Sequence, residues 1–166
     1  MDYANKHKNS TNSPDSYWKE QAELIAWHKK PASTLSTNSE GWHEWYADGE
    51  LNTSYLALDY HIEQGRGEQV ALIYDSPVTE QKQQFTYNEL TEQVAKFADF
   101  LRSQDVAKGD RVLIYMPMIP QAAIAMLACA RLGAIHSVVF GGFAAHELAV
   151  RIDDAQPKVI VSASCG

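Results

Sequence analysis

Residues 109–143 read GDRVLIYMPMIPQAAIAMLACARLGAIHSVVFGGF, and this stretch decides the fold of the chain. Within it, residues 112–116 are a short apolar run, which is typical of a strand buried on both faces of a sheet, and residues 135–140 read as a second strand. A helical pattern lies between them, and strand, helix and strand joined by short turns indicate a right-handed parallel unit. The sequence therefore predicts an α/β fold built on a mostly parallel sheet.

The helix between these strands is expected over residues 120–132. Pro120 suits the first turn of a helix, where its missing N–H would have no partner, and Gly133 suits the C-terminal cap. The side chains between them are almost all apolar, so the helix has no polar stripe and should lie in the core of a larger body. At about 13 residues it is too short to cross a bilayer, which needs roughly 20.

Gly141 and Gly142 directly follow the second strand. Open α/β sheets bind ligands outside the carboxyl ends of their strands, and glycine lets a ligand approach the backbone closely. The pair could equally serve as a tight turn between the strand and the next helix. The chain contains neither GxGxxG nor GxxxxGK[ST], so a dinucleotide fingerprint and a P-loop are not indicated.

Composition narrows the class of protein. The chain has 166 residues, of which 45% are hydrophobic, enough for the core of a globular domain. Its formal net charge of −7 and its lack of a basic cluster argue against nucleic-acid and membrane partners. Cys129 and Cys165 do not form a disulfide framework, and the first residues lack an apolar signal region, so we expect a cytoplasmic protein.

The six histidines show no spacing typical of metal ligands, and we therefore expect no metal site. His136, in the middle of an apolar strand, could be a catalytic base, but a hydrogen-bonded core histidine is the favoured interpretation. We name no catalytic residue in this chain.

Upstream of the central stretch, the patterns predict two helices and a hairpin. An amphipathic helix is expected over residues 16–30, ending before Pro31. A second helix should begin at residue 52 or 53 and stop at Gly65, with its inner face formed by Tyr55, Leu58 and Ile62. Residues 70–74 read as a strand, followed by a polar link and a return around Gln84-Phe85.

The residues TYNE at positions 86–89 have the form of a capping box, with Thr86 as N-cap and Glu89 reaching back to it. The helix that follows carries one apolar face, made of Leu90, Val94, Phe97, Ala98 and Leu101. A further helix is expected over residues 144–155, with Leu148 and Ile152 inward, and a further strand over residues 158–163.

Four tryptophans lie within the first 45 residues: Trp18, Trp27, Trp42 and Trp45. Such a set is wasteful on a free surface, so we expect this segment to pack against the rest of the protein, with an exposed partner-binding surface as the alternative. Residues 1–16 read as a mobile polar tail. The chain stops at Gly166, directly after a strand, and we expect it to be a piece of a longer protein.

Three stretches together resemble a known family: WYADGELN at residues 45–52, FTYNEL at residues 85–90 and the long run at residues 109–143. They are similar to the N-terminal third or less of the AMP-forming acetyl-CoA and propionyl-CoA synthetases of the adenylate-forming superfamily. Residues 141–166 resemble the propionyl-CoA branch more than the acetyl-CoA branch. The resemblance divides the chain into the tail, an N-terminal extension at residues 17–65, and an incomplete AMP-binding domain at residues 66–166.

The resemblance implies a reaction and its substrates. A carboxylate and Mg-ATP give an acyl-adenylate and pyrophosphate, and the thiol of coenzyme A then displaces AMP, so propionate would become propionyl-CoA. The phosphate loop, the ribose-binding aspartate and the catalytic lysine of the family would all lie beyond Gly166. The fragment alone is therefore expected to be inactive, with the remaining part of the same polypeptide as its partner.

The resemblance also carries over one ligand contact. Phe140, Gly141 and Gly142 correspond to the family's Phe-Gly-Gly, which lies beside the nucleotide portion of coenzyme A. Arg151 could contact a phosphate, but pairing with Asp153, Asp154 or a helix end is favoured. The alternatives for function are an acetate–CoA ligase fragment and a non-enzymatic module that binds a protein partner; a small nucleotide-binding domain is disfavoured by the absent fingerprint.

Overall fold

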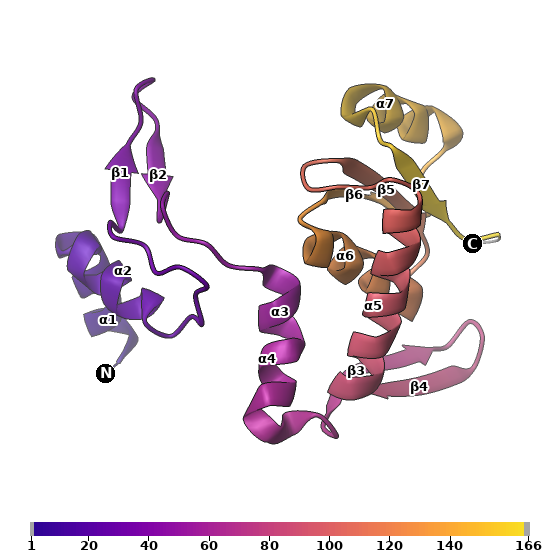
Figure 1. The fold of residues 1–166 in the computed structure, drawn as a ribbon, viewed down its shortest axis with the longest axis horizontal. Coiled ribbons are helices and arrows are strands. Elements are labelled where there is room, and N and C mark those ends of the chain that lie inside the picture. Colours follow the sequence, from indigo (N-terminus) through magenta and orange to yellow (C-terminus); the bar gives the residue numbers. More distant parts are fainter. Residues whose placement is uncertain (1, 165–166) are drawn as a thin grey trace. The chain divides into compact units, whose positions relative to one another are not determined.

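The structure is a computed structural model that describes residues 2–164, and its elements can be followed along the chain in Figure 1. The chain divides into two compact units, one up to Leu51 and the other from Asn52 onward. No helix among the described residues is both long enough and apolar enough to span a membrane.

The first unit contains two helices and a short antiparallel pair of strands: α1 (Tyr3–Asn12), α2 (Pro14–Ala22), β1 (Leu35–Thr37) and β2 (His43–Trp45). Helix α1 lies where the sequence predicts a polar tail. Asp2 caps it by accepting a hydrogen bond from the Asn5 N–H at 2.8 Å, and none of its side chains is buried. Residues 3–12 and 14–16 of the predicted tail are therefore helical, and its mobility stays a prediction.

The helix expected over residues 16–30 was predicted too long, because α2 already ends at Ala22. The indole of Trp27 turns back and donates a hydrogen bond to the Ala22 carbonyl at 2.8 Å. The same carbonyl accepts the Ile25 N–H at 3.2 Å, a bond to the third residue along in place of the fourth that an α-helix would use. The chain then runs to an isolated bridge between Lys29 and Glu50 instead.

The second unit begins with broken helical turns and continues into an α/β arrangement. Its elements are α3 (Thr53–Ala57), α4 (Asp59–His61), the π-helical turn η1 (Ile62–Arg66), β3 (Val70–Ser76), β4 (Gln81–Thr86), α5 (Tyr87–Ser103), β5 (Arg111–Met116), α6 (Pro120–Leu132), β6 (Ile135–Phe140), α7 (Ala145–Ala155) and β7 (Val159–Ser162). The single helix expected from residue 52 to residue 65 is interrupted at Leu58, whose φ and ψ of −128° and −75° are not helical.

Strand β5 lies between β6 and β7 in the main sheet and is parallel to both. In register, Ile114 lies beside Val138 on one side and Val161 on the other. Figure 1 shows α7 on one face of this sheet and α5 and α6 on the other. The predicted parallel α/β fold is confirmed, and β3 and β4 form the expected antiparallel hairpin.

The core of the second unit lies between α5, α6 and the sheet. The buried side chains of α5 are Leu90, Val94, Ala98 and Leu101, and Phe97, the fifth residue of the predicted apolar face, is partly buried. They pack with a cluster that includes Ile124, Ala128 and Cys129 of α6 and the inward side chains of β5. Because Val112, Leu113 and Ile114 are all 0% exposed, β5 is buried on both faces, as expected.

Local signals set the ends of the two core helices. Thr86 accepts a hydrogen bond from the Glu89 N–H, and the Glu89 carboxylate accepts one from the Thr86 N–H at 2.8 Å, so the predicted capping box is present. Helix α6 begins at Pro120 and ends before Gly133, whose φ of 70° is the left-handed conformation that glycine adopts without a Cβ penalty.

His136 is exposed, so the interpretation of a core histidine was wrong. It lies on β6, an outer strand of the described sheet, beside the fully buried Val112 of β5. The apolar residues around His136 in the sequence indicate a strand but not which of its positions the neighbouring elements cover.

Candidate functional site

The candidate site is the turn that joins β6 to α7. Its four residues, 140–143, are closed by a hydrogen bond from the Phe143 N–H to the Phe140 carbonyl at 3.0 Å. The hydroxyl of Tyr115 donates a second bond to the Phe143 carbonyl at 2.8 Å and so ties the turn to β5. Phe140 lies in register with Met116, so the turn lies at the carboxyl ends of the strands, where the sequence places a contact loop.

Gly141 and Gly142 differ in what a larger residue would meet. Neither has a positive φ, so backbone conformation does not demand glycine at either position. A Cβ on Gly141 would lie 3.0 Å from the carbonyl carbon and oxygen of Met116, which are backbone atoms that cannot turn aside. A Cβ on Gly142 would instead meet the ring of Phe140 at 2.7 Å. Gly141 is therefore explained by close packing on β5, whereas Gly142 faces a side chain that can rotate.

Aromatic rings dominate the surface of the turn. Phe140 is 60% exposed, and its ring lies edge-on to that of Phe143 with centroids 5.9 Å apart. The guanidinium of Arg151 lies 4.9 Å from the centre of the Phe143 ring, which is a cation–π geometry. The turn therefore offers an exposed ring face next to backbone that carries no side chain.

Arg151 is paired, as expected, but not with Asp153 or Asp154. Its Nη1 atom donates to the Glu147 carboxylate at 2.9 Å and to the Glu147 carbonyl at 2.9 Å, one turn earlier in α7. Arg151 is the one lysine or arginine between residues 140 and 155, all of which the structure describes. The turn and α7 therefore present no free lysine or arginine to a phosphate.

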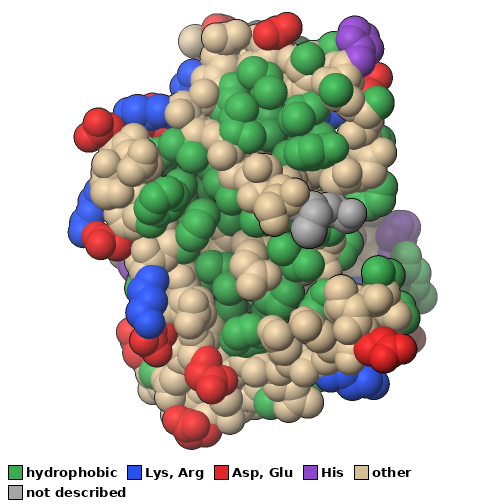
Figure 2. Space-filling model, turned by 90° about the vertical axis from the view of Figure 1, so that its right-hand side faces the viewer, with side chains coloured by type: hydrophobic (Ala, Val, Ile, Leu, Met, Phe, Trp, Pro, Cys, Tyr) green, Lys and Arg blue, Asp and Glu red, His purple; other side chains and the backbone are tan. Residues whose placement is uncertain are grey.

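A groove of about 610 Å³ lies between β4, α5, α6 and the carboxyl ends of β5 and β7. Its lining is mostly apolar with several amide side chains: Gln83, Phe85, Gln93, Lys96, Phe97, Phe100, Met116, Gln121, Ile124, Val161 and Ser162. Figure 2 looks onto this side of the molecule, where hydrophobic side chains gather between charged groups.

Sequence reasoning did not anticipate this groove or the part played by Tyr115. The one signal for the groove is Phe100, which stands beside the apolar face of α5 instead of within it and is 51% exposed. Among residues 2–164, no group of three or more His, Cys, Asp or Glu side chains could hold a metal ion.

Comparison with protein-family models gives two adjacent matches. Residues 59–165 match the AMP-binding enzyme family, and residues 3–57 match the acetyl-coenzyme A synthetase N-terminus. Together the two matches account for nearly the whole chain.

Individual relatives agree with these matches. The chain is 53% identical to the mitochondrial acyl-CoA synthetase short-chain family member 3 of Mus musculus, over 95% of this chain and 23% of that protein. It is 48% identical to acetyl-coenzyme A synthetase 1 of Pseudomonas aeruginosa, over 99% of this chain and 26% of that protein. The acetoacetyl-CoA synthetase from Streptomyces lividans superposes with a TM-score of 0.86 at 30% identity, covering 98% of this chain and 25% of that one. The chain thus spans about a quarter of the length of these relatives.

Proposed function

Because the chain belongs to the AMP-binding enzyme family, we propose that it is the N-terminal portion of an AMP-forming short-chain acyl-CoA synthetase that acts on propionate. The observation that carries the proposal is the order of the two family matches, an acetyl-CoA-synthetase N-terminus followed directly by an AMP-binding region. The similar proteins named as short-chain acyl-CoA and acetyl-CoA synthetases support the same reaction class.

The reaction joins a carboxylate to coenzyme A at the expense of ATP. A carboxylate is a poor electrophile because its negative charge repels a thiolate. Transfer of AMP onto one carboxylate oxygen releases pyrophosphate and creates a good leaving group, which the thiol then displaces to give the thioester and AMP. Magnesium would accompany the ATP and offset the charge of its phosphates.

Within this chain, we assign the turn at Phe140, Gly141 and Gly142 to the nucleotide portion of coenzyme A. The exposed Phe140 ring can stack on a base, and the bare backbone of the exposed Gly142 permits close approach. Arg151 is held by Glu147, so the phosphates would be met by groups outside residues 140–155. The rest of the second unit supplies the scaffold that positions this turn.

Phe140→Ala in the complete protein tests the assignment of the turn. The KM for coenzyme A should rise several-fold, while ATP–pyrophosphate exchange, which needs no coenzyme A, should stay at the wild-type rate. Val138→Ala is the matched control, because Val138 lies on the same strand and is 52% exposed. An unchanged KM in Phe140→Ala, or an equal rise in the control, would contradict the assignment.

The choice of propionate rests on the resemblance of residues 141–166 to the propionyl-CoA branch, with acetate as the alternative. ATP–pyrophosphate exchange by the complete protein, measured with each acid, should give a higher kcat/KM for propionate. A higher kcat/KM for acetate would mean that acetate, and not propionate, is the preferred substrate. The absence of exchange with either acid would overturn the proposed reaction class. Residues 1–166 alone should catalyse no exchange. The division at residues 16 and 65 and the cytoplasmic location stay predictions, the latter testable by cell fractionation.

A further inference from the structure

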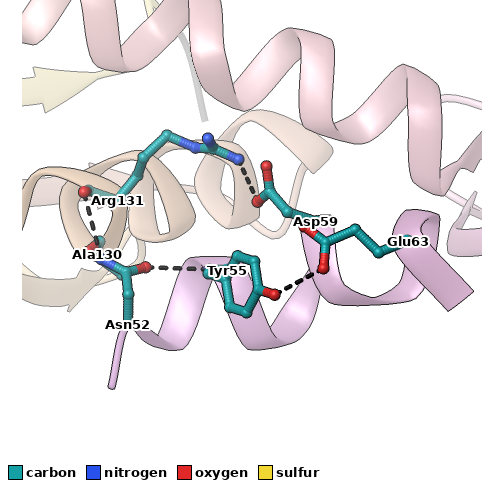
Figure 3. Close-up of polar contacts among 6 residues, drawn as sticks. All are labelled: Asn52, Tyr55, Asp59, Glu63, Ala130 and Arg131. Atoms are coloured by element: carbon teal, nitrogen blue, oxygen red, sulfur yellow. Dashed lines mark hydrogen bonds and ion pairs between the residues drawn. The ribbon is translucent and has the colours of Figure 1, made fainter. Parts of the chain in front are cut away.

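Asn52 bonds two helices at once (Figure 3). Its side-chain oxygen accepts a hydrogen bond from the Tyr55 N–H at 3.0 Å, which caps the start of α3. Its side-chain nitrogen donates to the carbonyls of Ala130 and Arg131 at 2.9 and 3.3 Å, near the end of α6. One amide thus serves an N–H group at the start of one helix and two carbonyls at the end of another.

An ion pair seven residues further along joins the same two segments. Arg131 of α6 donates to Asp59 of α4 at 2.6 Å, and both side chains are only 29% exposed. Between the two contacts lies Leu58, which is 1% exposed and belongs to the main core cluster. By contrast, the bond from the Tyr55 hydroxyl to Glu63 stays within the α3–η1 segment and reaches no part of α6.

These contacts connect the two family-matched regions. Asn52 lies in the stretch that matches the acetyl-coenzyme A synthetase N-terminus, whereas Asp59 and Arg131 lie in the AMP-binding match. Asn52 is also the first residue of the second compact unit. On the preceding side, Glu50 is held to its own unit by backbone bonds with His28 and Lys29.

We propose that Asn52, Asp59 and Arg131 form a latch that fastens residues 52–66 to the end of α6, and that its release opens this segment locally while the sheet stays folded. Helices α3 and α4 are too short to be stable alone, so their order depends on such tertiary contacts. The main core cluster draws on α5, α6 and β5 and contains a single buried residue of the segment, Leu58. The inference concerns the fold of this chain and does not depend on the proposed reaction.

Hydrogen–deuterium exchange of the complete protein tests the latch. Asn52→Ala should speed exchange of the amides in residues 53–66 roughly tenfold, the factor that a lost cap corresponds to. The amides of β5 and β6 should exchange at the wild-type rate, which also shows that the variant is folded. Thr53→Ala is the matched control, because Thr53 is exposed and begins the same helix.

Asn52→Asp separates the latch from simple helix capping. Aspartate caps α3 as well as asparagine does, but it cannot donate to the α6 carbonyls and brings negative charge to the negative end of that helix. If the latch exists, the amides of residues 53–66 should exchange in Asn52→Asp at least as fast as in Asn52→Ala. If Asn52 only caps α3, they should exchange at the wild-type rate, and that result would overturn the proposal. If Asn52→Ala does not accumulate, Asp59→Asn should give the same local opening. Acceleration that extends equally into β5 and β6 would also overturn it.

Discussion

The two glycines of the turn should respond very differently to the same substitution. Alanine at Gly141 places a Cβ 3.0 Å from the Met116 backbone, closer than ordinary van der Waals contact, and strand β5 cannot move without disturbing its pairing on both sides. Overpacking of this kind costs about 2 kcal/mol. Alanine at Gly142 meets only the Phe140 ring, which is largely exposed and can rotate away.

Chemical unfolding of Gly141→Ala and Gly142→Ala measures the difference. With a urea dependence of about 2 kcal/mol per molar, Gly141→Ala should lower the midpoint by about 1 M. Gly142→Ala should leave it unchanged or raise it slightly, since alanine reduces the freedom of the unfolded chain. Both variants share this effect on the unfolded chain, so the difference between their urea midpoints measures the clash at Gly141.

The chain offers an internal reference for this measurement. All four of its tryptophans lie before residue 46, so their fluorescence follows the first unit, while far-UV circular dichroism also follows the helices of the second. The dichroism midpoint is therefore the one that Gly141→Ala must lower. Equal midpoints for the two variants would refute the packing argument, as would a Gly142→Ala variant that is the less stable of the pair.

Three further outcomes are expected. Thr86→Ala should lower stability by about 1 kcal/mol in the same urea assay, because the Glu89 N–H loses its cap. Burial, together with the charge of Arg66, lowers the pKa of His61 below its ordinary 6.5, so the unfolded chain binds a proton that the folded chain does not. Stability should therefore fall as the pH drops from 7.5 to 5.5, and His61→Gln should flatten that dependence. Burial raises the pKa of the Cys129 thiol to about 11, so in a Cys165→Ser background a thiol reagent at pH 8 should react only as urea unfolds the chain.

The features that the sequence predicted correctly depend on local chemistry. The capping box at Thr86 and the glycine cap at residue 133 each need only a few neighbouring residues, and both are present. The strands at residues 111–116 and 135–140 follow from apolar runs between turns. In these places local preference and tertiary packing agree, so the prediction did not require knowledge of the rest of the fold.

The features that were missed depend on partners distant in the sequence or on an unusual side-chain contact. The indole of Trp27 folds back onto the Ala22 carbonyl at the end of α2, a contact that no helical periodicity could reveal. His136 lies exposed on an outer strand, and its neighbours in the sequence do not show which positions of that strand are covered. At the site, the sequence located the turn, but the clash that makes Gly141 necessary comes from Met116, on a different strand. Arg151 pairs with Glu147, one turn earlier in α7. This helix has three acidic residues, and the sequence alone did not show which of them would bind Arg151.

The order of strands in the main sheet bears on how the chain is assembled. Strand β5 pairs with β6 after one intervening helix, but with β7 only after two helices and another strand. Doubling the length of a closing loop costs only about 0.6 kcal/mol, so the loop entropy of the β5–β7 pairing is only slightly less favourable than that of the β5–β6 pairing. Synthesis from the N-terminus separates the two pairings in time, because β6 leaves the ribosome before β7 does. Of the three described strands, β7 is therefore the last to join, and until then one edge of β5 stays open to a wrong partner.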